Sequence, residues 1–413
     1  MVNFIHKTYI LPIPDKYQIF AKKLAMESGR IYPKAVSFLN RMYSNNARVS
    51  PKTLYTYMSL WTHEREFTLY SQSVQASYQQ AWQAWQASWK KLKKAKAEQK
   101  STSKIKLPHK AKKYNKVCYK EAAIHIEDGA IVLSNKRNAE KIVVLFQGLS
   151  APPKYAELIF HADRGKYYLH VTFEIENAQP TQHNGVLSVD LGVVHPMVCF
   201  DNQNVLLYNG GVLNCKLRYR NKKLAEFQQK LSRCKKSSNQ YRRLQRAKRR
   251  ILHKLKNQVR DVLQKYTSHL VEYCLKSKIN VVVLGNVKGI RNKAMYNKVA
   301  NQKIHQWLFR KLASILANKC AFAGIRVEYI SESYTSQTCP VYGTKNKPSN
   351  RNYRCSGCGF EYHREGVGVV NIWQKYTGVS LVVGHLTCPT GVRYQPHLRC
   401  PDRWNVHPVG KAA

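Results

Sequence analysis

The segment Val327–Ile372 constrains the fold more than any other part of the chain, because strand, thiol and carboxylate signals follow one another within it. Its beginning, from Val327 to Ser331, alternates with period two and predicts a β-strand that ends near Glu332. Two cysteine-bearing turns follow, and Glu365 then stands at the first turn of an apolar helical pattern. The segment therefore predicts an α/β domain with a metal-type knuckle between a strand and a helix.

The two turns have the spacing of a zinc knuckle from which one thiol is missing. Cys355 and Cys358 stand in a CxxCG sequence, whereas Cys339 is followed by Tyr342 where a second cysteine would stand. A structural zinc site uses four ligands, so Cys339, Cys355 and Cys358 are candidate ligands of a degenerate site. The alternative is an empty, hydrogen-bonded hairpin. A fourth ligand could come from His363, Cys388 or Cys400.

The charge balance predicts a polyanionic partner. The chain has 69 Lys and Arg against 23 Asp and Glu, a net charge of +46. Between Lys216 and Arg260, eighteen basic residues accompany only Glu226, which suits helices that lie along a phosphate backbone. The candidate nucleic-acid contacts are Lys222, Lys223, Arg242, Arg243, Arg246, Lys248, Arg249 and Arg250.

Composition also indicates the cellular compartment in which we expect the chain. No apolar run reaches the roughly 18 to 20 residues that a membrane span needs, and no signal peptide is visible, so we expect no membrane partner. Eleven cysteines without a regular secreted framework predict a reducing interior. We expect the cytoplasm of a bacterium or an archaeon.

The N-terminal half changes character twice. Residues 1–14 alternate as a strand, and residues 15–104 follow with helical periodicity. Residues 105–182 contain short alternating segments that predict an antiparallel sheet or small barrel. One helix face carries aromatic residues at spacings of three or four, which predicts a packed core stripe, with stacking on unpaired bases as the alternative. These residues are Tyr78, Trp82, Trp85 and Trp89.

The order of elements after residue 183 is typical of an RNase H-like fold. A buried strand ends at Asp190, and strands at 197–200 and 204–208 follow it. Helices at 213–277, a strand at 280–284, a helix at 304–322, a strand at 326–331 and a final helix complete a mixed sheet with helices. The tail from Gly378 has no clear period, and we expect it to be irregular and flexible.

Taken together, these motifs resemble the TnpB proteins of insertion sequences, which are RNA-guided DNA endonucleases related to compact type V CRISPR effectors. The matching motifs, found in order between residues 188 and 373, are Ser188–Val193, Tyr334–Pro340, the Cys355/Cys358 hairpin, His363–Glu365 and Asn371–Ile372. The resemblance implies an α/β fold plus a β-barrel, organised as a RuvC-like nuclease domain and a wedge barrel interrupted by a helical recognition lobe.

The domain boundaries implied by this resemblance follow the changes in sequence character. The wedge barrel would comprise 1–14 and 105–182, and the helical lobe 15–104. The nuclease domain would comprise 183–332 and 361–376, with the knuckle inserted at 333–360. Residues 377–413 would form the tail.

The resemblance also implies a guide RNA, a double-stranded DNA target and Mg²⁺ held by carboxylates. RuvC-type nucleases use two Mg²⁺ ions. Of the ten acids from Asp190 onward, Glu226, Asp261 and Glu272 are better explained by local salt bridges on basic helices. In the commonest family pattern a Glu ends the strand that here covers Val281–Leu284, and this chain has Gly285-Asn286 instead. A subset of the family has Gly-Asp there with Glu before Tyr-Thr-Ser, so the resemblance assigns the second acid to Glu332, with Asn286 in place of an acid. The predicted catalytic residues and magnesium ligands are Asp190, Glu332 and Glu365, the last standing where the family usually has Asp.

Several functions remain open at this point. The chain could cleave DNA, or it could be a nuclease-deficient relative that acts as an RNA-guided repressor or recruiting module. Other classes are a transposase that joins DNA ends and an RNA-binding protein with an inactive nuclease fold. The oligomeric state, monomer or homodimer, is also open.

Overall fold

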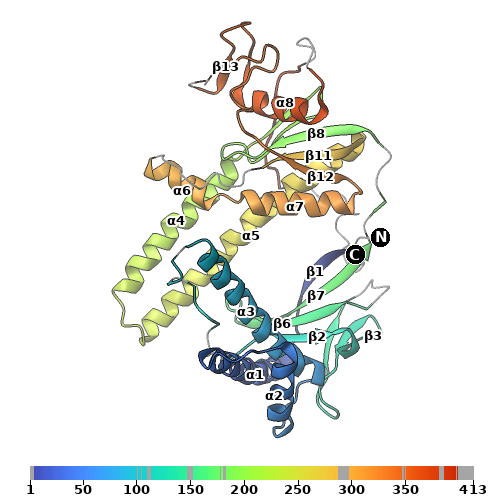
Figure 1. Cartoon of the computed structure of the whole chain (residues 1–413), viewed down its shortest axis with the longest axis vertical. Coiled ribbons are helices and arrows are strands. Elements are labelled where there is room, and N and C mark those ends of the chain that lie inside the picture. Colours follow the sequence, from blue (N-terminus) through green and yellow to red (C-terminus); the bar gives the residue numbers. More distant parts are fainter. Residues whose placement is uncertain are drawn as a thin grey trace. The chain divides into compact units, whose positions relative to one another are not determined.

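The computed structural model describes residues 4–99, 101–103, 105–108, 113–146, 152–176, 178–179, 183–286, 297–346, 348, 350–380, 386–396 and 398. The chain divides into two compact units, whose main parts are His6–Ile175 and Glu176–Val406. Their elements are labelled in Figure 1. Among the described helices, none combines the length and the apolar character that a bilayer crossing requires.

The first unit has two sheets with a helical segment inserted between their strands. The first strand of the chain lies beside the last strand of the unit in a four-stranded sheet of order β1-β7-β6-β2, and β3-β4-β5 form a second sheet. The helices between β1 and β2 are therefore an insertion, as predicted. The strands are β1 (Phe4–Pro12), β2 (Val117–Lys120), β3 (Ile124–Glu127), β4 (Ala130–Leu133), β5 (Ile142–Leu145), β6 (Tyr155–His161) and β7 (Lys166–Glu176).

The inserted helices are α1 (Gln18–Ser44), α2 (Pro51–His63) and α3 (Ser71–Ala97). They share one apolar core with the strands of this unit. Tyr78 and Trp85 are buried, and the rings of Trp82 and Trp89 stack on Trp85 with centroids 5.7 and 6.1 Å away. The predicted core stripe is confirmed, and burial in the core leaves little of Trp85 for base stacking.

The second unit contains a six-stranded mixed sheet of order β12-β11-β8-β9-β10-β15. β9 is antiparallel to β8 and β10, whereas β11 is parallel to β8 and β12. This arrangement confirms the predicted RNase H-like sheet. The strands are β8 (Gly185–Asp190), β9 (Val198–Phe200), β10 (Val205–Tyr208), β11 (Ile279–Gly285), β12 (Arg326–Ile330) and β15 (Thr390–Val392).

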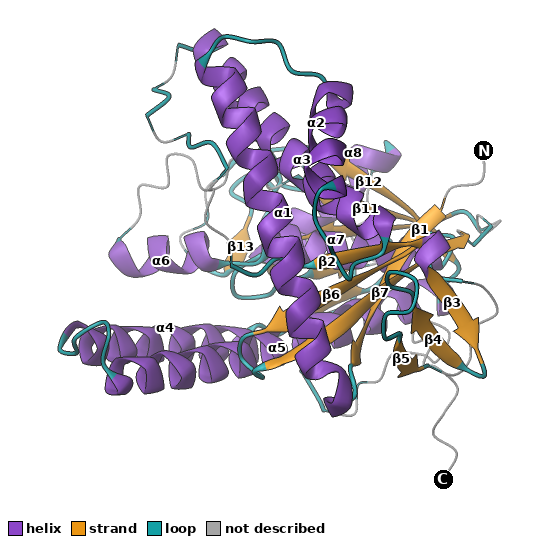
Figure 2. Ribbon diagram, turned by 90° about the horizontal axis from the view of Figure 1, so that it is seen from below, coloured by secondary structure: helices purple, strands orange, loops and turns teal. Residues whose placement is uncertain are grey.

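Helices cover both faces of this sheet. On one face, α8 (Arg364–Thr377) packs Val369 and Trp373 against a cluster that includes Phe200. On the other face, α5 (Asn239–Lys276) and α7 (Phe309–Phe322) contribute to a larger core. The basic segment forms a hairpin in which α4 (Gly211–Ser232) runs beside α5, as Figure 2 shows.

Two predictions about elements in this unit are wrong. The helix expected over 304–322 is two helices, α6 (Lys298–Gln306) and α7, because the backbone of Trp307 is extended (ψ 146°) and its indole is buried. The tail is not wholly irregular, since β15 pairs in parallel with β10. The tail residues 399–413 lie outside the described residues.

Candidate functional site

Two of the predicted catalytic carboxylates lie where neighbouring parallel strands of the mixed sheet have their carboxyl ends, which we call the carboxylate edge. Asp190 ends β8, and Glu332 follows β12, at the carboxyl ends of strands that both neighbour β11. Gly285 ends β11 between them. A Cβ atom on Gly285 would lie 2.0 Å from Oε1 of Glu332 and 2.5 Å from its Cγ. The Glu332 side chain therefore occupies the space that a side chain at position 285 would need.

Among the residues that the structure describes, no positive side chain forms an ion pair with either of these two carboxylates. Burial raises the pKa of Asp190 to about 6, and the charge of Glu365 adds to this effect. Burial also raises the pKa of Glu332 to about 8, with a further contribution from Asp190. Oε1 of Glu332 is buried and accepts no hydrogen bond from the described residues. Since a buried carboxylate oxygen without a partner is costly, a cation would stabilise this pair.

The third predicted carboxylate, Glu365, has two partners. Nδ1 of His195 bonds to its Oε2, and Nη1 of Arg351 lies 3.1 Å from its Oε1. Burial acts to raise the pKa of Glu365, but the His195 hydrogen bond and the charges of His195 and Arg351 outweigh it and lower the pKa. Glu365 is thus held as an anion by protein groups alone.

The three carboxylates lie near one another without forming a single tight cluster. A Cβ atom on Gly368 of α8 would lie 3.2 Å from Oδ2 of Asp190, so Asp190 packs one turn beyond Glu365. Within the described part of the chain, one group of three or more potential ligands has its atoms all within 4.8 Å, and it contains cysteines. Asp190 therefore lies between two glutamates with opposite surroundings.

Hydrogen bonds from α8 position the loop that follows Glu332. Nδ2 of Asn371 donates to the backbone oxygens of Thr335 and Thr338, both at 2.7 Å. Oγ of Ser188, on β8, donates to the backbone oxygen of Val369 at 2.8 Å. The strand with Asp190, the helix with Glu365 and the loop with Glu332 are thereby fixed to one another.

The knuckle brings Cys339, Cys355 and Cys358 together. The sulfurs of Cys339 and Cys358 are 3.7 Å apart, and all three lie within 4.8 Å. Backbone N–H groups, chiefly that of Cys358, lower the pKa of Cys355 to about 7, which favours the thiolate that a metal requires. The short strands β13 (Asn352–Arg354) and β14 (Glu361–His363) form the base of this insertion.

The two cysteine-bearing turns of the knuckle have similar backbone conformations. Gly343 donates to the carbonyl of Cys339 at 2.9 Å, and Gly359 donates to that of Cys355 at 3.1 Å. Both glycines have a left-handed backbone, with φ +75° and +72°. Tyr342 therefore occupies the position of a fourth ligand, but its side chain is 68% exposed.

The other candidates for a fourth ligand do not join the three thiols. Neither His363 nor Cys388 belongs to the cluster that the described residues form, and Cys400 lies outside those residues. Nδ1 of His363 is buried and has no hydrogen-bond partner in the part of the chain that the structure describes. The described side chains therefore bring three candidate ligands together here and no fourth one.

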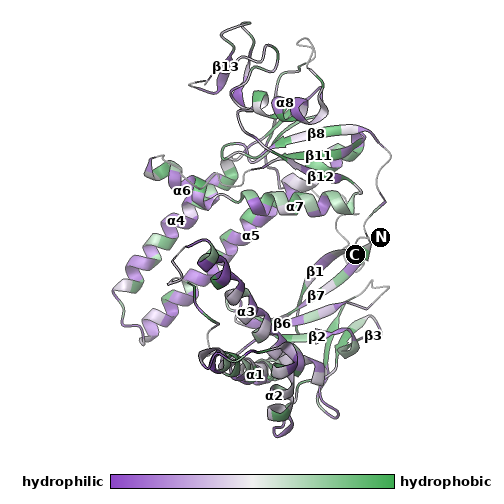
Figure 3. Cartoon of the chain, viewed as in Figure 1, coloured by the Kyte–Doolittle hydropathy of each residue, from purple (hydrophilic) through white to green (hydrophobic). Residues whose placement is uncertain are grey.

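The predicted nucleic-acid contacts lie on the hairpin of α4 and α5. Arg242, Arg243, Arg246, Arg249, Arg250 and Lys222 are exposed, whereas Lys223 and Lys248 are half-buried. Lys223 pairs with Glu226 at 2.8 Å, but the five arginines have no carboxylate partner among the residues the structure describes. The half of α5 before Leu255 has no buried residue, and it is hydrophilic in Figure 3. This surface is available to phosphates.

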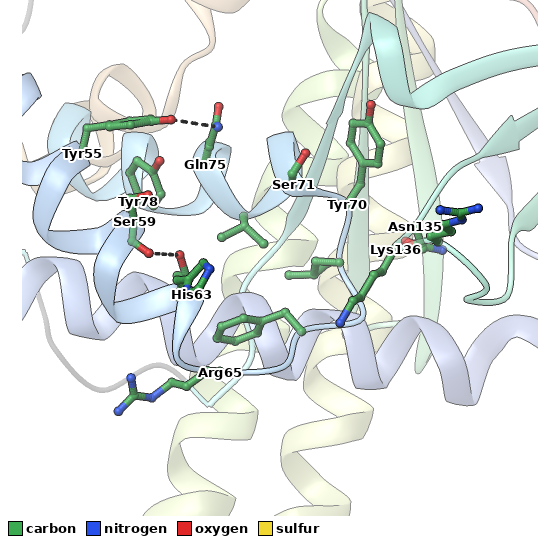
Figure 4. A pocket seen from close by; sticks show the side chains of 15 residues that line it. Tyr55, Ser59, His63, Arg65, Tyr70, Ser71, Gln75, Tyr78, Asn135 and Lys136 are labelled. Carbon is green, nitrogen blue, oxygen red and sulfur yellow. Dashed lines mark hydrogen bonds between the residues drawn. The ribbon is translucent and has the colours of Figure 1, made fainter.

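The first unit contains a pocket without any carboxylate in its lining. Figure 4 shows Tyr55, Gln75 and Ser71 along one side and Lys136 on another. Nε2 of Gln75 lies 3.4 Å from the hydroxyl of Tyr55, so its carbonyl oxygen has no partner in that contact. Aromatic, amide and cationic groups together are suited to contact bases and phosphates.

Sequence reasoning missed His195 and Arg351, which hold Glu365. His195 follows Asp190 by five residues, so its place near the end of β8 was a usable signal. Arg351 offered none, because it lies within the knuckle insertion and reaches Glu365 only through the pairing of β13 with β14. The register of that short hairpin depends on tertiary structure.

Two parts of the chain match known protein families. Residues 170–291 match the family described as Probable transposase, and residues 309–372 match the family described as Cas12f1-like, TNB domain. The first match covers the strand with Asp190 and the basic hairpin. The second covers Glu332, the knuckle and Glu365.

Individual relatives agree with these matches. The chain is 29% identical to TnpB-like protein MJ0751 of Methanocaldococcus jannaschii over 149 residues, which is 35% of this chain and 53% of the relative. It is 27% identical to the CRISPR-associated endodeoxyribonuclease Cas12f2 of a Micrarchaeota archaeon over 259 residues, covering 56% and 45%. The matched part of the chain thus spans about half the length of these curated relatives.

A solved structure shares the fold. The Cas12f1 chain of a complex with single-guide RNA and target DNA superposes with a TM-score of 0.59 and 12% identity. The match covers 89% of this chain and 98% of that one. At this identity, the similarity is evidence of fold.

Proposed function

We propose that this chain, which belongs to the TnpB family, uses a guide RNA to recognise double-stranded DNA and cleaves it by Mg²⁺-dependent phosphodiester hydrolysis. The observation that carries the proposal is the pair of half-buried carboxylates Asp190 and Glu332 at the carboxyl ends of strands in an RNase H-like sheet, where Oε1 of Glu332 is buried and has no hydrogen-bond partner among the described residues. A relative is named as an endodeoxyribonuclease, and the solved neighbour is bound to a guide RNA and target DNA.

The residues present fit a magnesium ion. Mg²⁺ prefers carboxylate oxygens, and Oε1 of Glu332 has no other partner among the described residues. In this proposal Asp190 and Glu332 hold the ion, which would supply charge stabilisation and orient a water molecule. Gly285 leaves room for Glu332, and Gly368 allows Asp190 to lie against α8. Glu365 adds a third negative charge near Asp190, and its oxygens are paired with His195 and Arg351.

The exposed arginines of α5 are proposed to bind the backbone of the guide or of the guide–target duplex. Binding should weaken steeply between low and physiological salt, because each phosphate contact releases a counterion. Arg246→Ala should reduce the slope of log Kd against log salt by about one, and Lys276→Ala, at the end of the same helix, serves as the control. An unchanged slope for Arg246→Ala would remove this residue from the interface.

The pocket of the first unit is proposed to read a short DNA motif next to the target. Gln75→Ala should relax the preference among target-flanking sequences, whereas Gln79→Ala, exposed on the same helix and outside the pocket, should not. Binding to a library of randomised flanking sequences measures both. Identical preferences in the two variants would contradict this assignment.

The knuckle is proposed to bind zinc through Cys339, Cys355 and Cys358. Supplying the missing ligand should tighten binding, so Tyr342→Cys should raise zinc affinity by about a hundredfold or more. Cys388→Ser changes an exposed cysteine outside the cluster and should leave the affinity unchanged. Competition with a chromogenic chelator gives the affinities, and equal values for wild type and Tyr342→Cys would contradict the assignment.

The test of guided binding begins with the RNA that copurifies with the full-length chain. After sequencing that RNA, DNA retention is compared for a matching duplex and a scrambled duplex of the same composition. The proposal predicts retention of the matching duplex alone. Equal retention of both duplexes would instead indicate an RNA-binding protein without guided recognition.

One observation favours a second candidate, a nuclease-deficient protein that represses or recruits at a guided site. Glu365 is already paired with Arg351 and His195, so the carboxylate that follows the His-Arg motif is not free for a metal. This candidate predicts guided DNA binding with no break in the target. The same binding assay followed by gel analysis of the DNA separates the two candidates.

A further inference from the structure

We propose that Arg351 takes the place of a second divalent cation at this centre, so that the chain binds one metal ion through Asp190 and Glu332. The inference deepens the proposed function and rests on its assignment of the carboxylate edge as a metal site. It concerns the number of ions and the residue that sets that number.

The first step is the state of the Glu365 carboxylate. Each of its oxygens has its own partner, since Arg351 lies 3.1 Å from Oε1 and His195 bonds to Oε2. A carboxylate can accept further bonds, but a metal ion placed against it would lie close to the guanidinium. That guanidinium is positive at every accessible pH. A second divalent ion at Glu365 must therefore displace Arg351 or bear its repulsion.

The second step is that Arg351 is held by the knuckle and not by the metal site. The backbone oxygen of Arg351 accepts a hydrogen bond from the N–H of Arg364 at 2.7 Å. The next residue, Asn352, begins the strand that pairs with β14, in register with His363. The backbone on both sides of the ion pair is thus fixed, and the guanidinium lies beside Glu365 without any contribution from Asp190 or Glu332.

The third step is the contrast with Glu332, which has no such partner. Its Oε1 is buried and has no hydrogen-bond partner among the described residues, and its side chain lies against Gly285. A cation is therefore favoured beside Glu332 and Asp190, and it is disfavoured beside Glu365. The distribution of fixed charge predicts one ion at this edge.

The fourth step concerns what Arg351 can still contact. Its side chain is 52% exposed, so the N–H groups that do not face Glu365 are open to solvent. Such groups can donate to a phosphate oxygen, as guanidinium groups commonly do. Arg351 therefore replaces the charge of an ion while remaining accessible to a DNA backbone.

The experiment counts Mn²⁺ ions on the full-length chain. The protein is freed of nucleic acid at high salt and its knuckle is saturated with zinc, and bound Mn²⁺ is then found from the electron paramagnetic resonance signal of the free ion. The expected count is one ion for wild type and two for Arg351→Ala. Glu332→Gln should lower the wild-type count to zero.

Two control variants make the count specific to Arg351. Arg351→Lys keeps a positive charge and should still bind one ion. Arg354→Ala removes an arginine from β13, the strand that follows Arg351. The Arg354 side chain is 77% exposed and pairs with Glu361, and this variant too should bind one ion. Thermal melting of each variant checks that the fold is retained.

Two ions on wild type, or one ion on a folded Arg351→Ala, would overturn the inference. No ion on wild type would overturn both this inference and the proposed magnesium site. Guided DNA binding is measured separately and does not enter the count, so its failure would leave the one-ion result standing.

Discussion

Glu332 and Glu365 are the same side chain at one edge of one sheet, yet their surroundings are opposite. Glu332 lies over Gly285, and its Oε1 is buried and has no hydrogen-bond partner among the described side chains and backbone groups. Burial raises the pKa of Glu332 to about 8. Glu365 is bound by His195 and Arg351, which lower its pKa. We propose that the first glutamate is a metal ligand, whereas the second is already paired with positive side chains of the protein.

This difference shows why a list of acidic residues is a poor guide to a metal site. The charge of Glu365 raises the pKa of Asp190, and the charge of Asp190 raises the pKa of Glu332, so proximity to Asp190 alone does not distinguish the two glutamates. The distinction comes from the partner groups, and it predicts that changes at the two positions have unlike consequences.

The largest effect is expected for Asp190→Ala, because this residue stands between the two glutamates. Magnesium-dependent cleavage should fall by about a thousandfold or more, while affinity for the guided target stays within about twofold. Rates from a matched linear duplex and affinities from gel shift measure the two quantities. Cleavage at the wild-type rate would exclude Asp190 from the site.

The next effect concerns stability without divalent ions. Since the folded pKa of Glu332 is raised from 4.5 to about 8, its contribution to stability is complete below pH 4.5 and is lost as the pH rises through about 8. Glu332→Gln should remove that loss, and the variant should exceed wild type by about 2–3 kcal/mol at pH 8, less than the full shift implies because the side chain is half-buried.

Urea unfolding in a chelator, compared at pH 5 and pH 8, measures this difference. Glu361→Gln changes an exposed glutamate of β14 and is the control. A difference in unfolding free energy between Glu332→Gln and wild type that is independent of pH would show that the pKa of Glu332 is not raised in the folded chain.

At Glu365 the same substitution should lower the free energy of unfolding instead of raising it, and by a smaller amount. Its folded pKa is lowered, so its stabilising contribution is present above pH 4.5 and is lost as the pH falls through the folded value. Glu365→Gln should therefore destabilise the chain by about 0.5–1 kcal/mol at pH 7, with little difference at low pH. The same urea series tests this, and stabilisation by Glu365→Gln would contradict the ion pair.

The smallest expected effect is a gain in activity. Glu365→Asp shortens the side chain by one methylene, which should loosen its contact with Arg351 and raise the cleavage rate by about fivefold to tenfold. Glu361→Asp makes the same change outside the site and should have no effect. No gain in Glu365→Asp would place the limitation on cleavage elsewhere.

The sequence was sufficient for most of the second unit because its elements are marked locally. The strand ending at Asp190, the CxxCG turn and the apolar pattern after Glu365 each depend on neighbouring residues, and their order implies the sheet. The break at Trp307 and the strand at 390–392 were not predicted, because both depend on packing and on pairing with a distant element.

The proximity of the three candidate carboxylates was predictable from the sequence, whereas their electrostatic surroundings were not. Asp190, Glu332 and Glu365 do lie near one another, but the pairing of Glu365 with Arg351 depends on a hairpin inserted between them. The packing of the Glu332 side chain against Gly285 had one sign in the sequence, which is that residue 285 has no side chain.

The most direct test of the account is cleavage of a plasmid that carries the complement of the copurified RNA. With Mg²⁺, the wild-type chain should nick or break this plasmid and leave a scrambled plasmid intact, and Glu332→Gln should bind the target without cutting it. A plasmid cut equally by wild type and Glu332→Gln, or one bound by wild type and never cut, would contradict the assignment of Asp190 and Glu332 as the catalytic metal site.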